Sequence, residues 1–422
     1  MQETNEVVGA SPVEAPEPTL RSLIATVYLP TIIFSIGQGA VIPIVALAAR
    51  DIGASIAVAG ATAALRGIGT MVFDVPSGKL VARFGEQKAM VVATALLIVS
   101  LVGCVASPSV AAFAVFMFLM GCAWSVWLLA RLTYVSDVMP NHLRGRALST
   151  LGGVQRIGNF IGPFAGALAI SRWGIDGAYY VHIALAVVGC LVLYLLPEPY
   201  TPTRPVGHAQ MKVVRIVRDH RRTFLTAGVV AGVAGILRSA REVVIPLWGV
   251  HIGLDAAQVS LIFGIAAALD MTLFYPAGVV SDRWGRRAVA VPCLGILSLG
   301  LFLLPLTHGF TTLLLVSLLL AFGNGLGSGI VLTLGSDFAP KTGRPEFLGV
   351  WRLVADIGTA GGPLLLAGTE ALVSLVAASV VVGSVGLFGV AVVLLWMPEP
   401  MRRRPEELAP ATDEVLPAQA TA

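Results

Sequence analysis

Long apolar segments alternate with short polar connections along almost the whole chain. Each of these segments reaches about 20 residues, the length that an α-helix needs to cross a bilayer. None shows the alternation of apolar and polar positions that a membrane β-barrel strand keeps over about 10 residues. We therefore predict an all-α integral membrane protein with twelve transmembrane helices, at roughly residues 22–48, 56–78, 88–107, 110–136, 146–171, 176–196, 223–249, 256–280, 288–307, 310–335, 346–369 and 372–397.

The composition supports a membrane protein and argues against an enzyme. Hydrophobic residues make up 56% of the chain and charged residues only 12%, whereas about 25% of an average soluble chain is charged. The four cysteines lie in four different apolar segments, so we predict neither a disulfide framework nor a metal site. The sequence has no phosphate-binding loop and no nucleophile motif. We expect no enzyme activity, no cofactor, no nucleic-acid partner and a monomeric chain.

Lysine and arginine are concentrated on one side of the predicted membrane. The loops after the even-numbered helices and the two tails carry most of them, whereas the opposite side holds only Arg50 and Arg172. Because cytoplasmic loops are enriched in Lys and Arg, we expect both termini in the cytoplasm. The protein is then a multi-pass protein of the plasma (inner) membrane.

The same pattern divides the chain into five parts. Residues 1–20 and 401–422 are predicted to be disordered cytoplasmic tails. Residues 21–199 and 223–400 are predicted to be two bundles of six helices, joined by a cytoplasmic linker over residues 200–222. The linker is expected to lie on the membrane surface as an interfacial helix. One face of that helix carries Lys212, Arg215, Arg218 and Arg222.

The second bundle repeats the first at an offset of 200 residues. The stretch PSGKLVARFG, which begins at Pro76, corresponds to PAGVVSDRWG, which begins at Pro276. Further along, Asp137, Pro140, Arg144, Gly158, Gly162 and Pro163 match Asp337, Pro340, Arg344, Gly358, Gly362 and Pro363. Such a parallel repeat relates two bundles by a pseudo-twofold axis along the membrane normal, and it places a binding site between them near the midplane.

The loop between helices 8 and 9 resembles that of the major facilitator superfamily. The family motif Gly-x-x-x-Asp-Arg-x-Gly-Arg-Arg is complete in Gly278, Asp282, Arg283, Gly285, Arg286 and Arg287. The first copy keeps Gly78, Arg83 and Gly85 but has Ala82, Glu86 and Gln87 in place of Asp, Arg and Arg. The resemblance implies that these residues form a cytoplasmic gate. Asp282 is expected at the N-terminus of helix 5, where the helix dipole favours an anion.

Helix 5 carries most of a second family motif, Gly-x-x-x-Gly-Pro-x-x-Gly-Gly, which is typical of antiporters. It appears as Gly158, Gly162, Pro163 and Gly166, with Ala167 in place of the last glycine. The chain therefore resembles twelve-helix drug–proton antiporters, although helix 11 carries half of the same motif.

Ionisable residues inside the predicted helices are costly in a bilayer and indicate function. In the family fold, helix 2 lies beside helix 11 and helix 5 beside helix 8, so residues at equal depth can pair. Depth at about 1.5 Å per residue predicts three pairs between the bundles, Arg66–Asp356, Asp74–Arg352 and Arg156–Asp270. We interpret them as an ionic latch that couples protons to rocking, because protonation of Asp74 or Asp270 would loosen it. The alternative is that they are static packing contacts.

The resemblance places the substrate cavity among helices 1, 4, 7 and 10. On helix 4, Trp124, Trp127 and Arg131 share one face, and aromatic rings with a few polar groups suit an amphipathic organic substrate. Arg238 and Glu242 lie one helical turn apart and are expected to line the cavity or to satisfy each other. The predicted cavity residues are Ser35, Gln38, Trp124, Trp127, Arg131, Arg238, Glu242, Asn324 and Ser328.

Three functions fit these patterns. The first is proton-coupled efflux of small amphipathic compounds by rocker-switch alternating access, with the proton gradient as the energy source. The second is transport of an organic anion or phosphorylated metabolite, favoured by the excess of arginine over acidic residues in the membrane. Competition by cationic dyes would favour the first, and competition by organic anions the second. The third is a non-transporting membrane sensor or lipid-handling protein, which predicts no substrate flux.

Overall fold

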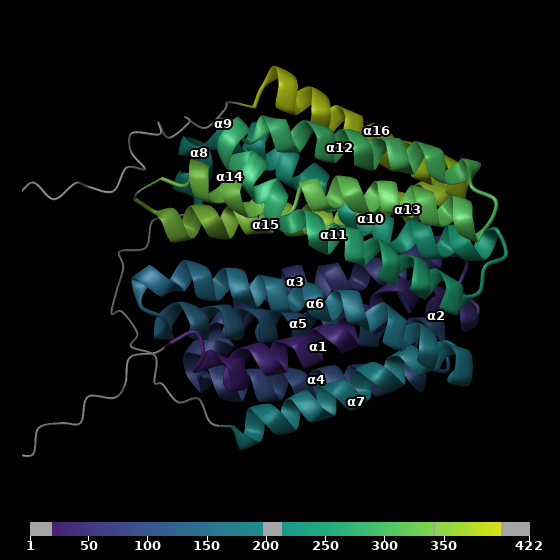
Figure 1. The fold of residues 1–422 in the computed structure, drawn as a ribbon, viewed down its shortest axis with the longest axis horizontal. Coiled ribbons are helices and arrows are strands. Elements are labelled where there is room, and N and C mark those ends of the chain that lie inside the picture. The colour runs from purple at the N-terminus through teal and green to yellow at the C-terminus, as the bar shows by residue number, and fades with distance from the viewer. Residues whose placement is uncertain (1–18, 197–212, 341, 398–422) are drawn as a thin grey trace, which may run out of the picture.

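The computed structural model describes residues 19–196, 213–340 and 342–397 (Figure 1). The described chain is helical and contains no strand. The predicted tails lie outside these ranges except for Thr19 and Leu20. Of the predicted linker, residues 213–222 are described. There the chain forms two short helices, α8 (Val213–Asp219) and α9 (Arg221–Thr223). The valines and arginines of α8 are exposed, while its Ile216 is buried, so α8 is amphipathic in part.

The N-terminal bundle contains six long helical segments. The first begins with a π-helical turn (Ile24–Tyr28) and continues as α1 and α2, which a short 3-10 turn separates. The helices of this bundle are α1 (Leu29–Val41), α2 (Val45–Asp51), α3 (Ile56–Phe84), α4 (Glu86–Val105), α5 (Val110–Val138), α6 (Asn141–Trp173) and α7 (Asp176–Leu195).

The C-terminal bundle repeats this plan. It also begins with a π-helical turn (Phe224–Gly228), and its fourth long segment is divided into α13 and α14. Its helices are α10 (Val229–His251), α11 (Ala256–Trp284), α12 (Arg287–Leu303), α13 (Phe310–Leu326), α14 (Ile330–Phe338), α15 (Arg344–Leu372) and α16 (Leu375–Leu395).

The 200-residue repeat is visible in the helix boundaries. Helices α3 and α11 begin and end at positions 200 residues apart, and so do the two π-helical turns. The glycines that end α3 and α11, Gly85 and Gly285, both have a positive φ, 82° and 93°. Only glycine adopts that conformation readily, which explains why both copies of the loop keep it. The two bundles have matching helix contacts as well, since α1 packs on α6 and α7 as α10 packs on α15 and α16.

Ten helices are long and apolar enough to cross a membrane among the residues described. The two predicted spans that fall short are α6 and α15. Both are long, at 33 and 29 residues, and Figure 1 shows them running alongside their neighbours. They are more polar because they carry charged residues that face the other bundle, including Arg156 on α6 and Arg352 on α15. Length and composition therefore support ten of the twelve predicted spans.

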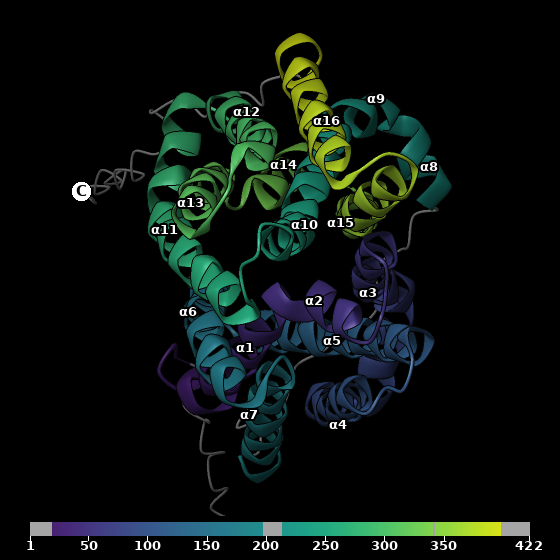
Figure 2. The same cartoon turned by 90° about the vertical axis from the view of Figure 1, so that its right-hand side faces the viewer.

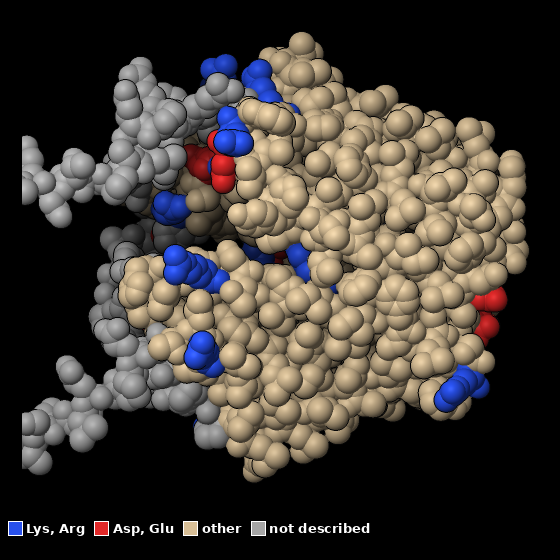
Figure 3. Space-filling view, viewed as in Figure 1, with Lys and Arg blue, Asp and Glu red and all other residues tan. Residues whose placement is uncertain are grey.

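The outer surface of the molecule is apolar. Large apolar side chains such as Val75, Leu332 and Leu372 are more than 70% exposed, and Figure 3 shows an almost uncharged surface between the two ends of the helices. In a soluble protein such a patch would be unusual. A bilayer covers it, in agreement with a multi-pass membrane protein.

The two bundles meet along two seams. Helix α3 packs on α15, and α6 packs on α11; Figure 2 shows the bundles facing each other when viewed along the helices. At the end where residues 45–51 form α2, the bundles also touch through α2 and α10. At the other end, which carries Arg83, Arg283 and Arg286 and which we call the arginine-rich end, Figure 3 shows a cleft between them. The space between the bundles therefore opens toward the arginine-rich end.

Candidate functional site

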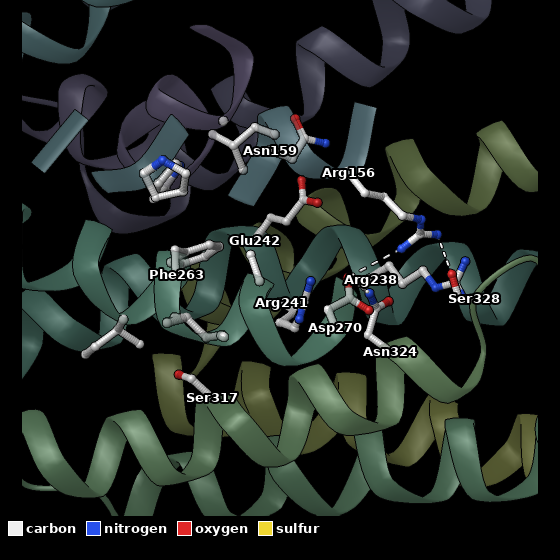
Figure 4. Close-up of a pocket in the computed structure, with 18 residues that line it drawn as sticks. Arg156, Asn159, Arg238, Arg241, Glu242, Phe263, Asp270, Ser317, Asn324 and Ser328 are labelled. Carbon is white, nitrogen blue, oxygen red and sulfur yellow. Dashed lines mark hydrogen bonds and ion pairs between the residues drawn. The ribbon is translucent and has the colours of Figure 1, made fainter. Parts of the chain in front are cut away.

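Two adjoining cavities lie between the bundles. One has a volume of about 210 Å³, and we call it the Arg241 cavity. The other has a volume of about 300 Å³, and we call it the Trp124 cavity. Ile42, Asn159 and Glu242 line both of them, so Glu242 stands at their junction. Figure 4 shows its carboxylate directed toward Asn159 and away from Arg241.

The ionisable residues are distributed unequally between the cavities. The Arg241 cavity is lined by three arginines, Arg156, Arg238 and Arg241, and by the acids Asp270 and Glu242. The Trp124 cavity is lined by one arginine, Arg66, and by the acids Glu242 and Asp356. Glu242 belongs to both lists, and its carboxylate is directed away from Arg241. Counted once, with the Trp124 cavity, it leaves three arginines and one acid in the Arg241 cavity and one arginine and two acids in the Trp124 cavity. The first cavity is therefore positive, and Glu242 makes the second negative.

Six of the nine predicted cavity residues line these spaces. Gln38 and Trp124 line the Trp124 cavity, and Glu242 lines both. Arg238, Asn324 and Ser328 line the Arg241 cavity. Beside them the helical segment is interrupted between α13 and α14, where Gly329 has a φ of 82°. The break gives Ser328 and the carbonyl group of Gly327 access to side chains from other helices.

Ser35, Trp127 and Arg131 were predicted to line the cavity, and this prediction is wrong. All three are buried in helix contacts inside the N-terminal bundle. Trp127 is buried and stacks on Phe34 of α1, with ring centroids 4.3 Å apart. The guanidinium of Arg131 lies 5.2 Å from the ring centroid of Trp127 and donates a hydrogen bond to the carbonyl of Thr26, at 2.8 Å. Ser35 is fully buried where α1 packs on α6. The face of α5 that carries Trp127 and Arg131 packs on α1, and of these residues only Trp124 reaches the space between the bundles.

One predicted ion pair links the bundles along the α3–α15 seam. Nη2 of Arg352 donates to Oδ1 of Asp74 at 3.1 Å, and the hydroxyl of Ser125 donates to the same oxygen at 2.6 Å. The predicted Arg66–Asp356 pair is absent among the described residues. Asp356 instead lies 3.5 Å from Nε of Arg352, one turn away on its own helix. A single arginine thus serves two carboxylates, one from each bundle.

The third predicted pair links the bundles along the α6–α11 seam. Nη1 of Arg156 lies 3.8 Å from Oδ2 of Asp270, and Nδ2 of Asn324 donates to the same oxygen at 2.9 Å. The other terminal nitrogen of Arg156 hydrogen-bonds to the hydroxyl of Ser328 at the break between α13 and α14. Arg156 also lies over the ring of Phe274, 4.5 Å from its centroid. Figure 4 shows these contacts converging on one side of the Arg241 cavity.

Three charged side chains of the cavities have no partner among the described residues. Arg241, Arg66 and Glu242 make no hydrogen bond and no ion pair there, and Nε of Arg241 is buried without an acceptor. Arg238 does not pair with Glu242, because its Nη2 donates to the carbonyl of Gly327 at 2.5 Å. The expectation that Arg238 and Glu242 satisfy each other is therefore wrong, and Glu242 is left facing the cavities.

The loop motif forms a charge cluster within the C-terminal bundle. Arg286 donates to Asp337 at 2.7 Å and to Asp282 at 2.8 Å. Burial by itself would lower the pKa of Arg286, but its hydrogen bonds with Asp337 and Asp282 outweigh that effect and raise the pKa. The side chain of Asp282 is 74% exposed. Asp282 does not cap the N-terminus of α6, the fifth predicted span, because the cleft separates the bundles at this end and Asp282 pairs with Arg286.

The remaining motif residues lie at the arginine-rich end or in helix contacts. Arg83 and Arg283 are exposed, and Arg287 donates to the carbonyl of Met397. A Cβ at Gly278 would meet open space, and one at Gly78 would make only an ordinary contact with Leu129, at 3.9 Å. The glycines of the antiporter-like motif, on α6, are close-packing positions. A side chain at Gly158 or Gly162 would collide with α1, and one at Gly166 would press tightly on Ala40 of the same helix. Pro163 of the same motif lines the Arg241 cavity.

The sequence places this architecture in a known family. The model of the Major Facilitator Superfamily matches residues 27–241 and 228–420, which together cover nearly the whole chain. The chain belongs to the major facilitator superfamily. Membership makes it a membrane transporter rather than an enzyme.

Relatives of this superfamily member include multidrug transporters. It is 19% identical to an uncharacterised MFS-type transporter of Methanocaldococcus jannaschii, over 80% of this chain and 89% of the relative. It is 26% identical to the multidrug resistance protein MdtG of Erwinia billingiae, over 41% of each chain. A bacterial homologue of the human lysosomal transporter Spinster, in an inward-facing and unoccupied conformation, has the same fold, with a TM-score of 0.75 and 13% identity over 90% of this chain and 97% of that one.

Several residues of the site did not emerge from the sequence as site residues. Asn159 and Gln155 line the cavities, and Asp337 joins the loop cluster. Asp337 could have been found, because it is one of the residues repeated at the 200-residue offset. Asn159 and Gln155 gave no signal, because a neutral amide in a helix is compatible with any helix face.

Proposed function

We propose that this transporter exports small amphipathic compounds in exchange for protons, by alternating access of the space between its two bundles. The observation that carries the proposal is the unpaired carboxylate of Glu242 at the junction of the two cavities. An ionised carboxylate in the membrane region is costly unless it is paired. Either a proton or a positively charged group of the substrate removes that cost, and the two exclude each other at one carboxylate.

Mutual exclusion at one site is the simplest basis of exchange. If a proton and a substrate each lower the other's affinity, the coupling is reciprocal. A carrier that reorients with either of them bound then moves them in opposite directions. Glu242 is suited to this role because it lines both cavities and makes no hydrogen bond or ion pair among the described residues. Neither a proton nor a substrate therefore has to displace a bound partner.

The seam contacts support a rocking motion. Arg352 bridges Asp74 of one bundle and Asp356 of its own, and Arg156 bridges Asp270 and Ser328. We propose that these links act as the latch between the bundles, and that protonation of Asp74, Asp270 or Asp356 loosens it. The arginine-rich end then faces the cytoplasm, in agreement with the enrichment of cytoplasmic loops in Lys and Arg. Both termini would be cytoplasmic and the protein would lie in the plasma membrane.

The direction of transport rests on the relatives. MdtG is named for multidrug resistance, and it is similar to this chain over 41% of each sequence. We extend efflux to this chain on that similarity. A second candidate, transport of an organic anion, is favoured by one observation, the three arginines that line the Arg241 cavity.

The experiment combines ligand binding with flux. Purified protein is first screened by thermal shift against amphipathic cations, anions and zwitterions, and the best ligand is then followed into proteoliposomes with an imposed pH gradient of either sign. We expect accumulation of the ligand when the gradient drives protons the other way, and reversal when the gradient is reversed. Ligand flux whose rate and direction do not change with the pH gradient, or no ligand flux at all, would contradict proton exchange.

A further inference from the structure

The two cavities have opposite charge, and this difference identifies the substrate class. With the shared Glu242 counted once, on the side to which its carboxylate points, three arginines and one acid line the Arg241 cavity, and one arginine and two acids line the Trp124 cavity. The Trp124 cavity stays negative when Arg352 and Asp74 are added to its lining. Arg352 adds one positive charge and Asp74 adds one negative charge, and Arg352 is shared between Asp74 and Asp356. A ligand that spans both cavities meets a positive region at one end and a negative region at the other.

The positive end has a free donor. The charge of Arg156 is already opposed by Asp270, and Arg238 is held by a backbone carbonyl. Arg241 has no partner among the described residues, and its Nε is buried without an acceptor. A guanidinium can bind a carboxylate through two parallel hydrogen bonds. Arg241 is therefore the group best placed to bind an acidic group of a ligand.

The negative end has a free acceptor and an aromatic wall. The Glu242 carboxylate is unpaired, and Figure 4 shows it turned away from Arg241, toward the side of the cavity occupied by Asn159. Trp124 lines the same cavity and stacks with Phe34, with ring centroids 5.6 Å apart. An ammonium group binds both to a carboxylate and to the face of an indole ring. The apolar body of a ligand can lie along the same wall.

We propose that the substrate is an amphipathic zwitterion, with its acidic group on Arg241, its amine on Glu242 and its apolar body in the Trp124 cavity. This assignment rests on the exchange proposed above and specifies it, since the amine is the group that competes with the proton. A purely cationic ligand would leave Arg241 unpaired, and a purely anionic ligand would place no positive group at Glu242. Only a zwitterion satisfies both side chains.

Three ligands with the same skeleton test the assignment. Tryptophan carries both charges, tryptamine only the amine, and indole-3-propionate only the acid. Binding to the purified full-length protein is measured by isothermal titration calorimetry near neutral pH. We expect tryptophan to bind about tenfold more tightly than either of the others, the factor that one charge-assisted hydrogen bond supplies. Equal binding of tryptophan and tryptamine, or no binding by any of the three, would overturn the assignment.

Two variants locate the two contacts. In Arg241→Gln, tryptophan should lose its advantage over tryptamine but keep its advantage over indole-3-propionate. In Glu242→Gln the result should be the reverse. Arg172→Gln and Glu370→Gln are the matched controls, because Arg172 is exposed, Glu370 is half-buried, and both are remote from the residues that line the cavities. They should bind all three ligands as the unmodified protein does. The same loss of binding for all ligands in both cavity variants would overturn the assignment.

These results separate the substrate class from the exchange mechanism. Tight and selective tryptophan binding without proton-dependent flux would support the zwitterion assignment and contradict exchange. Proton-dependent flux of tryptamine with no preference for tryptophan would support exchange and contradict the assignment.

Discussion

Arg352 of the C-terminal bundle donates a hydrogen bond to Asp74 of the N-terminal bundle, across 3.1 Å and 278 positions of sequence. The same guanidinium lies 3.5 Å from Asp356. The two acids share one cation, so the loss of charge on either changes how strongly Arg352 is held by the other. This arrangement links the protonation state of the seam to the contact between the bundles.

Asp74→Asn tests whether this link is a latch. The amide oxygen can still accept hydrogen bonds from Arg352 and Ser125, but the ionic attraction is lost. Because both side chains are partly exposed, at 35% and 22%, we expect a loss of stability of about 1 kcal/mol or less in thermal unfolding. We also expect altered proton dependence of flux. A variant that transports with unchanged proton dependence would remove Asp74 from the coupling.

The Arg156–Asp270 pair is tested by a double-mutant cycle. Arg156→Gln, Asp270→Asn and the double variant are compared by unfolding in the same detergent. Since the pair spans two bundles and shares Asn324 and Ser328, the double variant should be less destabilised than the sum of the single ones, with a coupling of about 1 kcal/mol. Strictly additive effects would show that the two side chains do not stabilise the seam together.

Two carboxylates of the loop cluster should differ in importance. Asp337 and Asp282 both accept from Arg286, but their side chains are 29% and 74% exposed. Exposed ion pairs contribute little because water and salt screen them. We expect Asp337→Asn to lower stability by about 1 kcal/mol and Asp282→Asn to have almost no effect. An equal or larger effect of Asp282→Asn would mean that it makes a more important contact in another conformation.

Two glycines of α6, Gly162 and Gly153, allow a test of close helix packing, because only the first contacts another helix. A methyl group at Gly162 would lie 2.6 Å from Cα of Gly39 and would overlap the backbone of α1, whereas one at Gly153 meets nothing within 4 Å. Overpacking costs about 1–3 kcal/mol, so Gly162→Ala should lower the unfolding temperature. Gly153→Ala should leave it unchanged or raise it, because alanine favours a helix. If both variants behave alike, close packing does not explain the antiporter-like motif.

Much of the fold could be predicted from the sequence because a bilayer limits the possibilities. The apolar segments and the 200-residue repeat predicted two bundles of the observed kind. Helices α6 and α15 are the two predicted spans that length and composition do not support. They carry charged residues, Arg156 and Arg352 among them, that contact the seams between the bundles. The break between α13 and α14 was not predicted, because Gly327 and Gly329 in an apolar segment are equally compatible with close packing.

The sequence predicts how deep a charged side chain lies in the membrane, but not which way it points from its helix. Counting residues along a helix gives the height of a side chain, and this was enough for Asp74–Arg352 and Arg156–Asp270. It does not give the angle around the helix axis. Asp356 therefore paired with Arg352 rather than Arg66, and Trp127 turned toward α1 rather than the cavity.

The central claim is that a proton and the substrate compete for the carboxylate of Glu242. Proteoliposomes that contain a trapped pH-sensitive dye report proton movement when the tightest-binding of the three indole ligands is added outside. We predict that the unmodified protein and Glu370→Gln move protons against the ligand, while Glu242→Gln moves the ligand without protons. Proton movement by Glu242→Gln at the rate of the unmodified protein would contradict the claim.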